Sequence, residues 1–232
     1  MFEESILKHH IQRQIVQVLM FSEYARFTDL CPPRVDTNLF SYHLKLLLKQ
    51  DYIAKTKLGY TLSHKGLLYV DRVSGAKMKP RTQPKIITML VIQNNRGEVL
   101  LQQRSKQPYI NTWTLPYGKI HIDDPSLLAA ANRETKEKLD ATPVNLDHAG
   151  DCYIRVNSNG VIESTTLAHV VRVQLNGLDI SDGLQWVAVD NMEQLKLAPA
   201  VLQIVTTSLN RNQPFFEEYT VENMPVNDSL AS

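Results

Sequence analysis

Residues 113–141 constrain this chain more than any other stretch, and they read WTLPYGKIHIDDPSLLAAANRETKEKLDA. The stretch predicts a helix from about Pro125 to Leu139. Glu134 and Glu137 lie three positions apart on it, so their carboxylates share one face. Hard cations such as Mg²⁺ prefer clustered oxygen ligands of this kind. Lys138 follows at the position where a third carboxylate would complete the cluster. The stretch therefore predicts a helix whose polar face carries the chemistry of the chain.

The same residues resemble the signature box of the Nudix hydrolases, whose pattern is G-x5-E-x7-R-E-U-x-E-E-x-G-U with U apolar. Gly118 matches the opening glycine, and a Trp-x-Leu-Pro sequence precedes it, as is often so in the family. Arg133 and Glu134 match the central pair, and Glu137 matches the first glutamate of the second pair. Asp124 stands where the first glutamate belongs. The resemblance implies a Nudix-like domain over residues 85–222.

The box departs from the family pattern in spacing and in residue type. Eight residues rather than seven separate Asp124 from Arg133, and Thr135 stands at an apolar position. Asp140 replaces the closing glycine, a change that a helix C-terminus tolerates. Lys138 replaces the second glutamate of the pair. We expect this last change to weaken metal binding, because a positive charge now stands in place of a negative one.

The resemblance also implies roles for individual side chains. Clustered carboxylates hold Mg²⁺ or Mn²⁺, and the cation neutralises phosphate charge and lowers the pKa of an attacking water. The expected metal ligands are Glu134, Glu137 and Asp124, and the expected catalytic residues, if hydrolysis is retained, are Glu134 and Glu137. The residues expected to bind the ligand are Arg104, Gly118, Arg133 and Lys138. The Lys138 ammonium is expected to fill the place of the metal and to meet phosphate oxygens directly.

Two other interpretations of this helix stay open. Hydrolysis would survive if a carboxylate outside the box supplied the base, and the candidates are Asp123, Asp124, Glu163 and Asp182. Alternatively, Glu134, Glu137 and Lys138 form only a solvated helix face with i,i+3 and i,i+4 ion pairs.

Length and composition are those of a globular protein with two modest domains. The chain has 232 residues, of which 43% are hydrophobic and 21% charged. Its apolar runs fall well short of the ~20 residues of a membrane-spanning helix, and its first residues lack the pattern of a signal peptide. We expect a cytoplasmic protein without a membrane partner. Cys31 and Cys152 have no metal-site spacing and are expected to be reduced.

Charge divides the chain into unlike halves. Residues 1–82 contain 13 Lys/Arg and 7 Asp/Glu, a balance of +6. Residues 83–232 contain 12 Lys/Arg and 17 Asp/Glu, a balance of −5, and the two sums give the net charge of +1. A basic front half and an acidic back half suggest different partners, although a few surface charges would erase the contrast. A polar segment with two prolines separates the halves. We therefore predict domains over residues 1–78 and 85–222, a linker over 79–84 and a disordered tail over 223–232.

The first half predicts helices followed by a small hairpin. Apolar periodicity indicates a helix from Ser5 to Phe21, and a short helix is expected from Arg26 to Leu30. Asp36 is a favourable N-cap for a third helix, which ends near Gln50 and buries Phe40, His43, Leu44 and Leu47. Tyr52–Lys57 and Gly59–Ser63 read as a hairpin, and a last helix starts near Lys65. We expect His43 to be a hydrogen-bonded core histidine rather than a ligand.

The sequence SYHLKLLLKQDYI, from Ser41 to Ile53, resembles the recognition-helix signature S-x-H-L-x-x-L-x-x-x-G-φ-φ of ArsR/MarR-like winged-helix regulators, where φ is apolar. Asp51 stands at the glycine position and tolerates the left-handed conformation better than most residues. In such a domain the third helix enters the major groove and the hairpin wing reaches the DNA backbone. The expected contacts to double-stranded DNA are Thr37, Asn38, Ser41, Tyr42 and Lys45 on the helix, with Lys55 and Lys57 on the wing. The alternative is a dimerisation or protein-binding module.

The second half predicts strands around the helix of the box. Ile86–Gln93 and Val99–Arg104 read as two strands of a hairpin. Further strands are expected over 150–155, 165–174 and 184–189, with a final helix over 199–210. The predicted fold is α+β: an N-terminal winged helix-turn-helix domain, then a Nudix-like α/β/α sandwich with a mixed sheet.

These features lead to one principal hypothesis of function and two others. The principal hypothesis is a DNA-binding transcriptional regulator, acting as a homodimer, whose Nudix-like domain senses a nucleotide or nucleoside-diphosphate-linked metabolite. The second is an active metal-dependent Nudix hydrolase that cleaves a nucleoside diphosphate linked to another group, with the winged helix as an accessory module. The third is a scaffold that has lost both activities.

Overall fold

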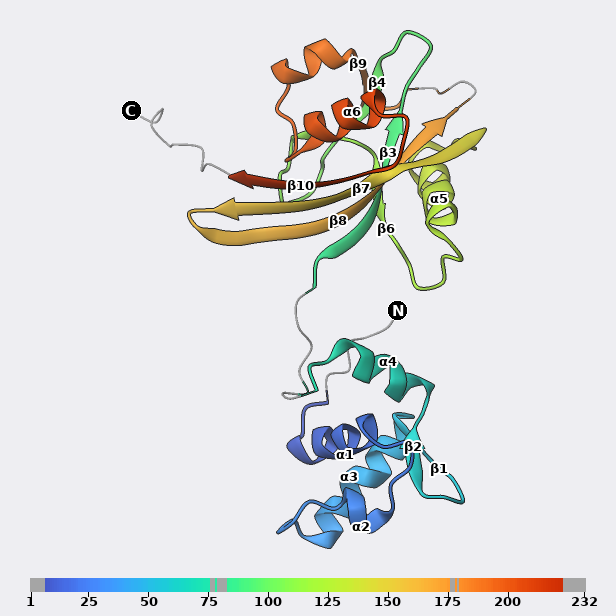
Figure 1. Cartoon of the computed structure of the whole chain (residues 1–232), viewed down its shortest axis with the longest axis vertical. Coiled ribbons are helices and arrows are strands. Elements are labelled where there is room, and N and C mark those ends of the chain that lie inside the picture. The colour runs from blue at the N-terminus through green and yellow to red at the C-terminus, as the bar shows by residue number, and fades with distance from the viewer. Residues whose placement is uncertain (1–6, 76–77, 79–82, 176–177, 179, 223–232) are drawn as a thin grey trace. The chain divides into compact units, whose positions relative to one another are not determined.

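The first unit of the chain builds its small core from helices. In this computed structural model, residues 7–75, 78, 83–175, 178 and 180–222 are described, and the chain divides into units of residues 1–82 and 83–232. The elements of the first unit are α1 (His10–Met20), α2 (Phe27–Leu30), α3 (Thr37–Lys49), β1 (Ile53–Lys55), β2 (Tyr60–Leu62) and α4 (His64–Arg72) (Figure 1). No helix in the described part of the chain is long and apolar enough to cross a membrane.

Helix α3 has the predicted start and the predicted buried face. The Asp36 side chain accepts from the backbone N–H groups of Asn38 and Leu39, which satisfies two donors at the helix start. The buried side chains are Phe40, His43, Leu44 and Leu47. Asp51 then takes the left-handed conformation, with φ 58°, and leads into the antiparallel β1–β2 hairpin. The remaining polar side of α3 is left exposed.

One expectation for this unit was wrong, and another holds for burial but not for hydrogen bonding at one ring nitrogen. Helix α1 begins at His10 rather than at Ser5, because His9 caps it by accepting from the Ile11 N–H; the start predicted at Ser5 lies outside the described residues, but Leu7 and Lys8 are not helical. His43 is buried, yet its Nδ1 has no hydrogen-bond partner in the described structure. Its ring instead stacks on His9, with centroids 3.8 Å apart. Burial, with His9 and His10 nearby, lowers the pKa of His43.

The second unit is built on a mixed five-stranded sheet in the order β10-β7-β8-β3-β6. These strands are β3 (Lys85–Ile92), β6 (Tyr117–Lys119), β7 (Asn145–Ser158), β8 (Val161–Gln174) and β10 (Phe215–Glu222). The β3–β8 and β7–β10 pairs are parallel, and the β3–β6 and β7–β8 pairs are antiparallel. A smaller antiparallel sheet has the order β5-β4-β9, with β4 (Val99–Gln103), β5 (Trp113–Thr114) and β9 (Leu184–Val187).

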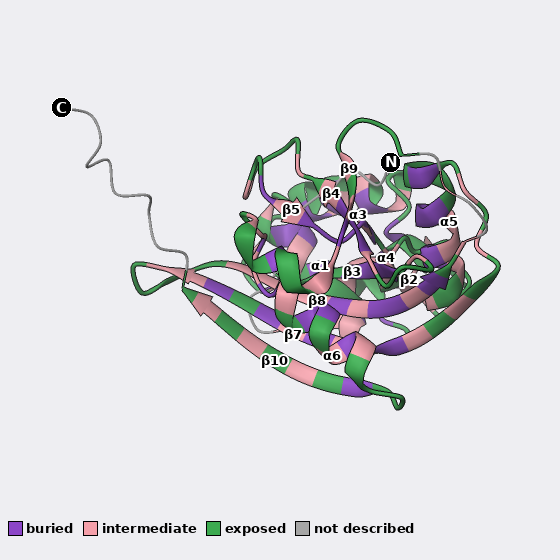
Figure 2. Ribbon diagram, turned by 90° about the horizontal axis from the view of Figure 1, so that it is seen from above, coloured by how far each residue is buried: buried purple, intermediate pink, exposed green. Residues whose placement is uncertain are grey.

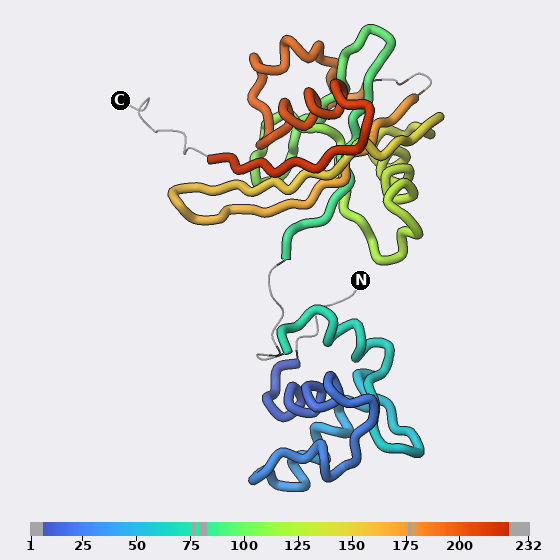
Figure 3. Tube along the Cα trace, in the orientation of Figure 1, coloured from blue at the N-terminus to red at the C-terminus, as the bar shows by residue number. Residues whose placement is uncertain are grey.

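Helices pack on the two faces of the main sheet through separate apolar clusters. Helix α5 (Leu127–Leu139) places Ala131 and Leu139 against Leu90 and Val171 on one face. Helix α6 (Val201–Asn210) and the short 3₁₀ helix η1 (Val189–Gln194) join the larger cluster, which contains Ile204 and Val205 together with sheet residues of β3, β7 and β8. The chain path in Figure 3 shows α5 apart from α6. The predicted α+β class with a mixed sheet is confirmed.

The predicted hairpin between the first two strands of this unit was wrong. The turn forms, with Asn94 and Gly97 making its backbone hydrogen bonds. However, β3 has β6 and β8 on its two edges, so β4 pairs with β5 and β9 in the other sheet. Only an isolated bridge, Gln93 to Val99, links the two strands. The turn therefore joins two sheets rather than the two strands of one hairpin.

Strand β10 closes the edge of the main sheet and was missed in the sequence. It runs parallel to β7, from the pair Phe215 and Gly150 to the pair Glu222 and Asn157. Figure 2 shows its residues alternating between intermediate and exposed after Phe215, which is buried. Short β5 and β6 were missed as well. Residues 79–82 of the predicted linker and all of the predicted tail, 223–232, lie outside the described residues.

Candidate ligand and charge site in the second unit

Helix α5 brings Glu134 against the sheet at Gly118. The helix begins at Ser126, whose side chain accepts from the Ala129 N–H, and ends at Asp140 in the left-handed conformation. The Glu134 side chain is only 6% exposed. A Cβ added to Gly118 would stand 1.6 Å from Glu134 Cδ, a distance that no real contact reaches. The glycine of the box is therefore the surface against which this carboxylate packs.

Arg133 connects the start of the box to its helix. Its Nε donates to Asp124 Oδ1 at 2.9 Å and its Nη2 donates to Asp124 Oδ2 at 2.7 Å. Its Nη1 donates to Glu134 Oε1 at 2.7 Å, and Nη2 also reaches the Lys119 carbonyl at 3.0 Å. The Arg133 guanidinium, together with the backbone N–H of His121, holds the pKa of the Asp124 carboxyl well below its usual range. The same pairing raises the pKa of Arg133.

Lys138 approaches Glu134 from the opposite side. Its Nζ lies 3.9 Å from Glu134 Oε2 and 5.9 Å from the centre of the Tyr117 ring. Each oxygen of the Glu134 carboxylate therefore faces a cation, Arg133 at one and Lys138 at the other. Glu137 lies on the outer side of Arg133, 3.4 Å from its Nη1, with 57% of its side chain exposed. The two carboxylates of the box thus share a face, as predicted from their spacing, but with cations between and beside them.

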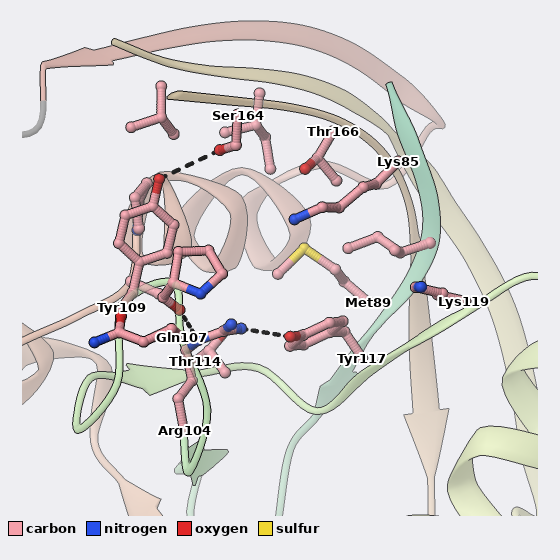
Figure 4. A pocket seen from close by; sticks show the side chains of 16 residues that line it. Lys85, Met89, Arg104, Gln107, Tyr109, Thr114, Tyr117, Lys119, Ser164 and Thr166 are labelled. Atoms are coloured by element: carbon pink, nitrogen blue, oxygen red, sulfur yellow. Dashed lines mark hydrogen bonds between the residues drawn. The ribbon is translucent and has the colours of Figure 1, made fainter. Parts of the chain in front are cut away.

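A cavity of about 260 Å³ opens beside this charge cluster (Figure 4). Its cations are Lys85, Arg104 and Lys119, and its ring-bearing side chains are Tyr109 and Tyr117. Its apolar side is formed by Ile87, Met89, Ile154, Val156, Ala198 and Pro199. Figure 4 shows the Lys85 side chain extending inward between Met89 and Thr166. An apolar cavity with a few convergent polar groups is the usual form of a small-molecule site, and here the charged groups are positive.

Arg104 is held in place by the cavity wall. Its Nε donates to the Pro108 carbonyl at 2.9 Å, its Nη1 donates to the Tyr117 hydroxyl, and its guanidinium lies 5.3 Å from the centre of the Tyr117 ring. Across the cavity, the hydroxyl groups of Tyr109 and Ser164 are 3.2 Å apart. Burial raises the pKa of Tyr109, so its ring is present as a neutral phenol. These contacts orient a guanidinium and two aromatic rings before any ligand arrives.

A second hollow of about 180 Å³ lies next to the cavity and includes Lys138 of the box. It shares Arg104, Thr114 and Tyr117 with the first cavity, and it is also lined by Lys106 and Lys138. Of the residues predicted to bind the ligand, Arg104 therefore lines both spaces and Lys138 lines the hollow. Gly118 and Arg133 do not line either space; they contact the carboxylate of Glu134.

Comparison with known families identifies the second unit. Residues 83–207 match the family model described as NUDIX domain, which is more than half of the chain. The chain belongs to the Nudix family. No curated protein matches it.

Several solved structures are similar to the Nudix unit. The NUDIX domain of Shewanella oneidensis NrtR, crystallised with ADP ribose, is 19% identical with a TM-score of 0.48, over 62% of this chain and 97% of that one. A MutT protein from Bacillus halodurans is 22% identical with a TM-score of 0.48, over 59% and 90%. Shewanella oneidensis NrtR in complex with a 27mer DNA is 21% identical with a TM-score of 0.42, over 54% and 59%.

The Nudix box of this chain is rearranged at its expected metal ligands. Asp124 uses both carboxylate oxygens for Arg133 and one of them for the His121 N–H, so it serves in this structure as the partner of Arg133. The carboxylate of Glu134 is paired with Arg133 and Lys138. Glu137 has the most exposed carboxylate of the three expected ligands. The alternative bases Asp123, Glu163 and Asp182 are not among the residues that line the cavity or the adjoining hollow.

Sequence reasoning missed several residues of the cavity, chiefly Lys85, Lys106, Tyr109 and Lys119. Each lies outside the Nudix pattern or at an unspecified position in it. Lys85 begins strand β3 and Lys119 ends strand β6. Their meeting depends on the β3–β6 pairing, in which Ile87 lies opposite Lys119.

The residues predicted to contact DNA are exposed or partly exposed in the first unit. Thr37, Asn38, Tyr42 and Lys45 are exposed on α3, and Ser41 is partly exposed between them. Lys55 and Lys57 are exposed on the hairpin. Tyr42 leaves 58% of its surface in solvent, which is a large value for an aromatic residue on a packed helix.

Proposed function

We propose that this chain is a DNA-binding transcriptional regulator whose Nudix domain binds a nucleotide or a nucleoside-diphosphate-linked metabolite as its effector. The observation that carries this proposal is the pairing of Glu134 with Arg133 and Lys138. A carboxylate that would hold a divalent cation already has a cation at each oxygen. A metal would have to displace the Lys138 ammonium, against the repulsion between like charges.

The charge of the cavity favours an anionic ligand without a metal. Lys85, Arg104 and Lys119 line the main cavity, and Lys106 and Lys138 line the hollow next to it. Arg and Lys bind phosphate oxygens directly, and a guanidinium does so with two parallel hydrogen bonds. Tyr109 and Tyr117 offer flat faces to a base or a sugar. A diphosphate with a ring system on at least one end matches this combination of groups.

The first unit supports the DNA-binding half of the proposal. The order of three helices, a two-stranded hairpin and a further helix is that of a winged helix-turn-helix. Its polar face on α3 and its two wing lysines are exposed, as contact with base edges and phosphates requires. We propose that two chains act together, because paired winged helices read paired half-sites.

The experiment that tests the proposal is a binding and hydrolysis screen of the full chain. Dinucleotides, nucleotide sugars and nucleoside triphosphates are offered with Mg²⁺, with Mn²⁺ and without metal, while thermal unfolding and product release are followed. We expect one class to raise the melting temperature without metal and without turnover. A ligand at 100 times its Kd stabilises by about 2.7 kcal/mol, which is easily seen.

Two variants make the screen specific to the cavity. Lys85→Ala removes an exposed cavity cation and is expected to lower the ligand-induced stabilisation, whereas Lys136→Ala, on the outer side of α5, is expected to leave it unchanged. If no compound stabilises the protein, or if both variants behave alike, the effector half of the proposal fails. Failure to bind DNA at low salt would end the regulator half.

The exposure of Glu137 favours active hydrolysis as the second candidate. Its carboxylate is largely in solvent, close to Arg133, and remains able to hold a metal with Glu134 if Lys138 swings away. This candidate predicts metal-dependent release of phosphate or a nucleoside monophosphate that Glu134→Gln abolishes. Turnover that survives Glu134→Gln would show that Glu134 is not essential and would favour a carboxylate outside the box as the base.

A further inference from the structure

Two histidines and an aspartate converge on the β7–β8 hairpin of the Nudix unit. His148, Asp151 and His169 each offer one ligand atom, and these three atoms all lie within 4.8 Å of one another. None of the three belongs to the Nudix box or lines the cavity. We propose that this cluster binds a divalent transition-metal ion, with Zn²⁺ as the best match to its donor atoms.

The strand geometry builds the cluster in two steps. Asp151 and His169 are directly opposite each other in the antiparallel β7–β8 pair, so their side chains project from the same face. His148 is three residues before Asp151, and side chains at that separation in a regular strand point to opposite faces. The register shifts between His148 and Gly150, which marks a β-bulge, and the extra residue returns His148 to the face of Asp151.

The bulge is secured by the neighbouring strand. Gly150 has φ 154°, and a Cβ there would stand 2.4 Å from the Phe215 carbonyl oxygen of β10. A larger residue would force the two strands apart. The bulge that turns His148 toward Asp151 therefore depends on the close packing of Gly150 against strand β10. All three proposed ligands lie on paired strands rather than on a loop.

The contacts within the cluster show how an ion would be held. Asp151 Oδ1 lies 3.0 Å from His148 Nε2 and 2.6 Å from His169 Nδ1, so one carboxylate oxygen joins the two imidazoles. A tetrahedral zinc at about 2.1 Å from each ligand separates neighbouring ligand atoms by roughly 3.4 Å, which small side-chain rotations reach from this spacing. The ion would replace the proton that each imidazole now shares with the carboxylate.

The donor set selects the class of metal. Two imidazole nitrogens and one carboxylate oxygen suit Zn²⁺ and its neighbours in the first transition row, whereas Mg²⁺ and Ca²⁺ prefer oxygen alone. The side chains of His148, Asp151 and His169 are 34%, 32% and 16% exposed, so an ion can enter from solvent and keep water at its remaining position. Three protein ligands with an open position is the pattern of reactive rather than closed zinc sites.

The cluster is separate from the charge site of the Nudix box. Along the sheet, His169 of β8 pairs with Thr88 of β3, and Thr88 pairs with Gly118 of β6. Two strand spacings, about 10 Å, therefore separate His169 from the backbone against which Glu134 packs. A zinc ion on the cluster and an anionic ligand in the cavity would occupy the same domain without sharing a residue.

The test is a zinc titration of the full-length protein by calorimetry after treatment with a chelator. The wild-type chain is expected to take up about one equivalent of Zn²⁺ that a large excess of Mg²⁺ does not displace. His148→Gln and Asp151→Asn are each expected to lose that equivalent. The matched control, the double variant His9→Gln/His10→Gln, removes two histidines of the first unit and is expected to retain it.

A second readout uses the wild-type protein, so the outcome does not depend on the folding of a variant. Imidazole nitrogen resonances are followed during the zinc titration, and Nε2 of one histidine and Nδ1 of another are expected to shift together at one equivalent. The absence of zinc binding by the wild-type chain would overturn the proposal. So would uptake that His148→Gln and Asp151→Asn leave unchanged, or uptake that disappears in the double variant.

Discussion

At the scale of single residues, Lys138 adds a second cation beside the carboxylate of Glu134 in the Nudix box. It places an ammonium 3.9 Å from a Glu134 oxygen whose partner oxygen already faces Arg133. Glu134 is nearly buried, and a buried carboxylate requires such compensation. The two cations therefore compensate the charge of a carboxylate that packs against the sheet, and we propose that they oppose metal binding there.

Lys138→Glu is expected to raise the affinity for Mg²⁺ and Mn²⁺, because it removes a competing cation and adds a third carboxylate beside Glu134 and Glu137. Titration with Mn²⁺, followed by electron paramagnetic resonance, measures the change. Lys136→Glu makes the same change of charge on the exposed side of α5 and is the control. Equal affinities in the wild-type and Lys138→Glu chains would mean that this helix face is only surface.

The Asp124–Arg133 pair predicts a pH dependence of stability. The pKa of Asp124 is lower in the folded chain than the ~3.9 of an unfolded aspartate, so the pair stabilises the fold fully above that value. Its contribution is lost as the pH falls from about 4 toward the folded pKa. Asp124→Asn should therefore be less stable than wild type at pH 7, with a difference that shrinks in acid.

Urea unfolding at a series of pH values measures this difference. Asp123→Asn is the control, because Asp123 is an exposed neighbour that makes no ion pair with Arg133 in the structure. A difference for Asp124→Asn that is the same at pH 3 and pH 7 would contradict the role of the charged pair.

At the scale of elements, helix α3 buries one apolar face, while the lysines of the β1–β2 hairpin are exposed. Phe40, Leu44 and Leu47 fill the interior of the first unit, and the polar positions between them stay exposed. The hairpin carries Lys55 and Lys57 away from the core. Exposed residues of the helix and hairpin can be substituted without disturbing the core. The predicted DNA contacts can therefore be tested by substitution.

Lys45→Ala and Lys57→Ala are each expected to weaken DNA binding on all sequences alike. Each should also reduce the slope of log K against log salt by about 0.9, because one phosphate contact is lost. Fluorescence anisotropy with duplex DNA at several salt concentrations gives both values. Arg72→Ala, an exposed substitution at the end of α4, should leave the slope unchanged. A wild-type slope near zero would show that lysines do not contact DNA phosphates here.

At the scale of the whole molecule, the basic balance of the first unit suits its proposed DNA partner, whereas the second unit is acidic overall and would meet an anionic ligand only through local cations. The first 82 residues carry a balance of +6 and the remainder carry −5, and three of the 12 Lys/Arg of the remainder, Lys85, Arg104 and Lys119, line the cavity. A regulator needs the ligand to bind one DNA-binding state better than another. The coupling must then act equally in both directions.

The effector found in the screen should change the affinity for DNA by some factor, and DNA should change the affinity for the effector by the same factor. Two titrations measure this, one of DNA into protein saturated with effector and one of effector into the protein–DNA complex. Lys85→Ala should abolish both changes while DNA binding by the free protein stays intact. If the effector binds without any effect on DNA affinity, the two units act independently.

Much of the architecture was determined by the sequence alone, because it depends on neighbours within a few residues. The buried face of α3, its Asp36 cap and the shared face of Glu134 and Glu137 follow from helical periodicity. The Nudix box and the family it indicates are likewise local patterns, and the family is confirmed.

Only the tertiary structure decided which distant residues meet. Strand β4 does not pair with β3, because β8 and β6 occupy the two edges of β3. No local sequence pattern shows which strands will take those edges. Lys85, Arg104 and Tyr117 come from three separate segments, so their meeting in one cavity depends on long-range strand pairing. His148, Asp151 and His169 meet through a bulge and a register between strands. Sequence therefore determined the chemistry of each element, and the packing of the sheets determined which chemistries share a site.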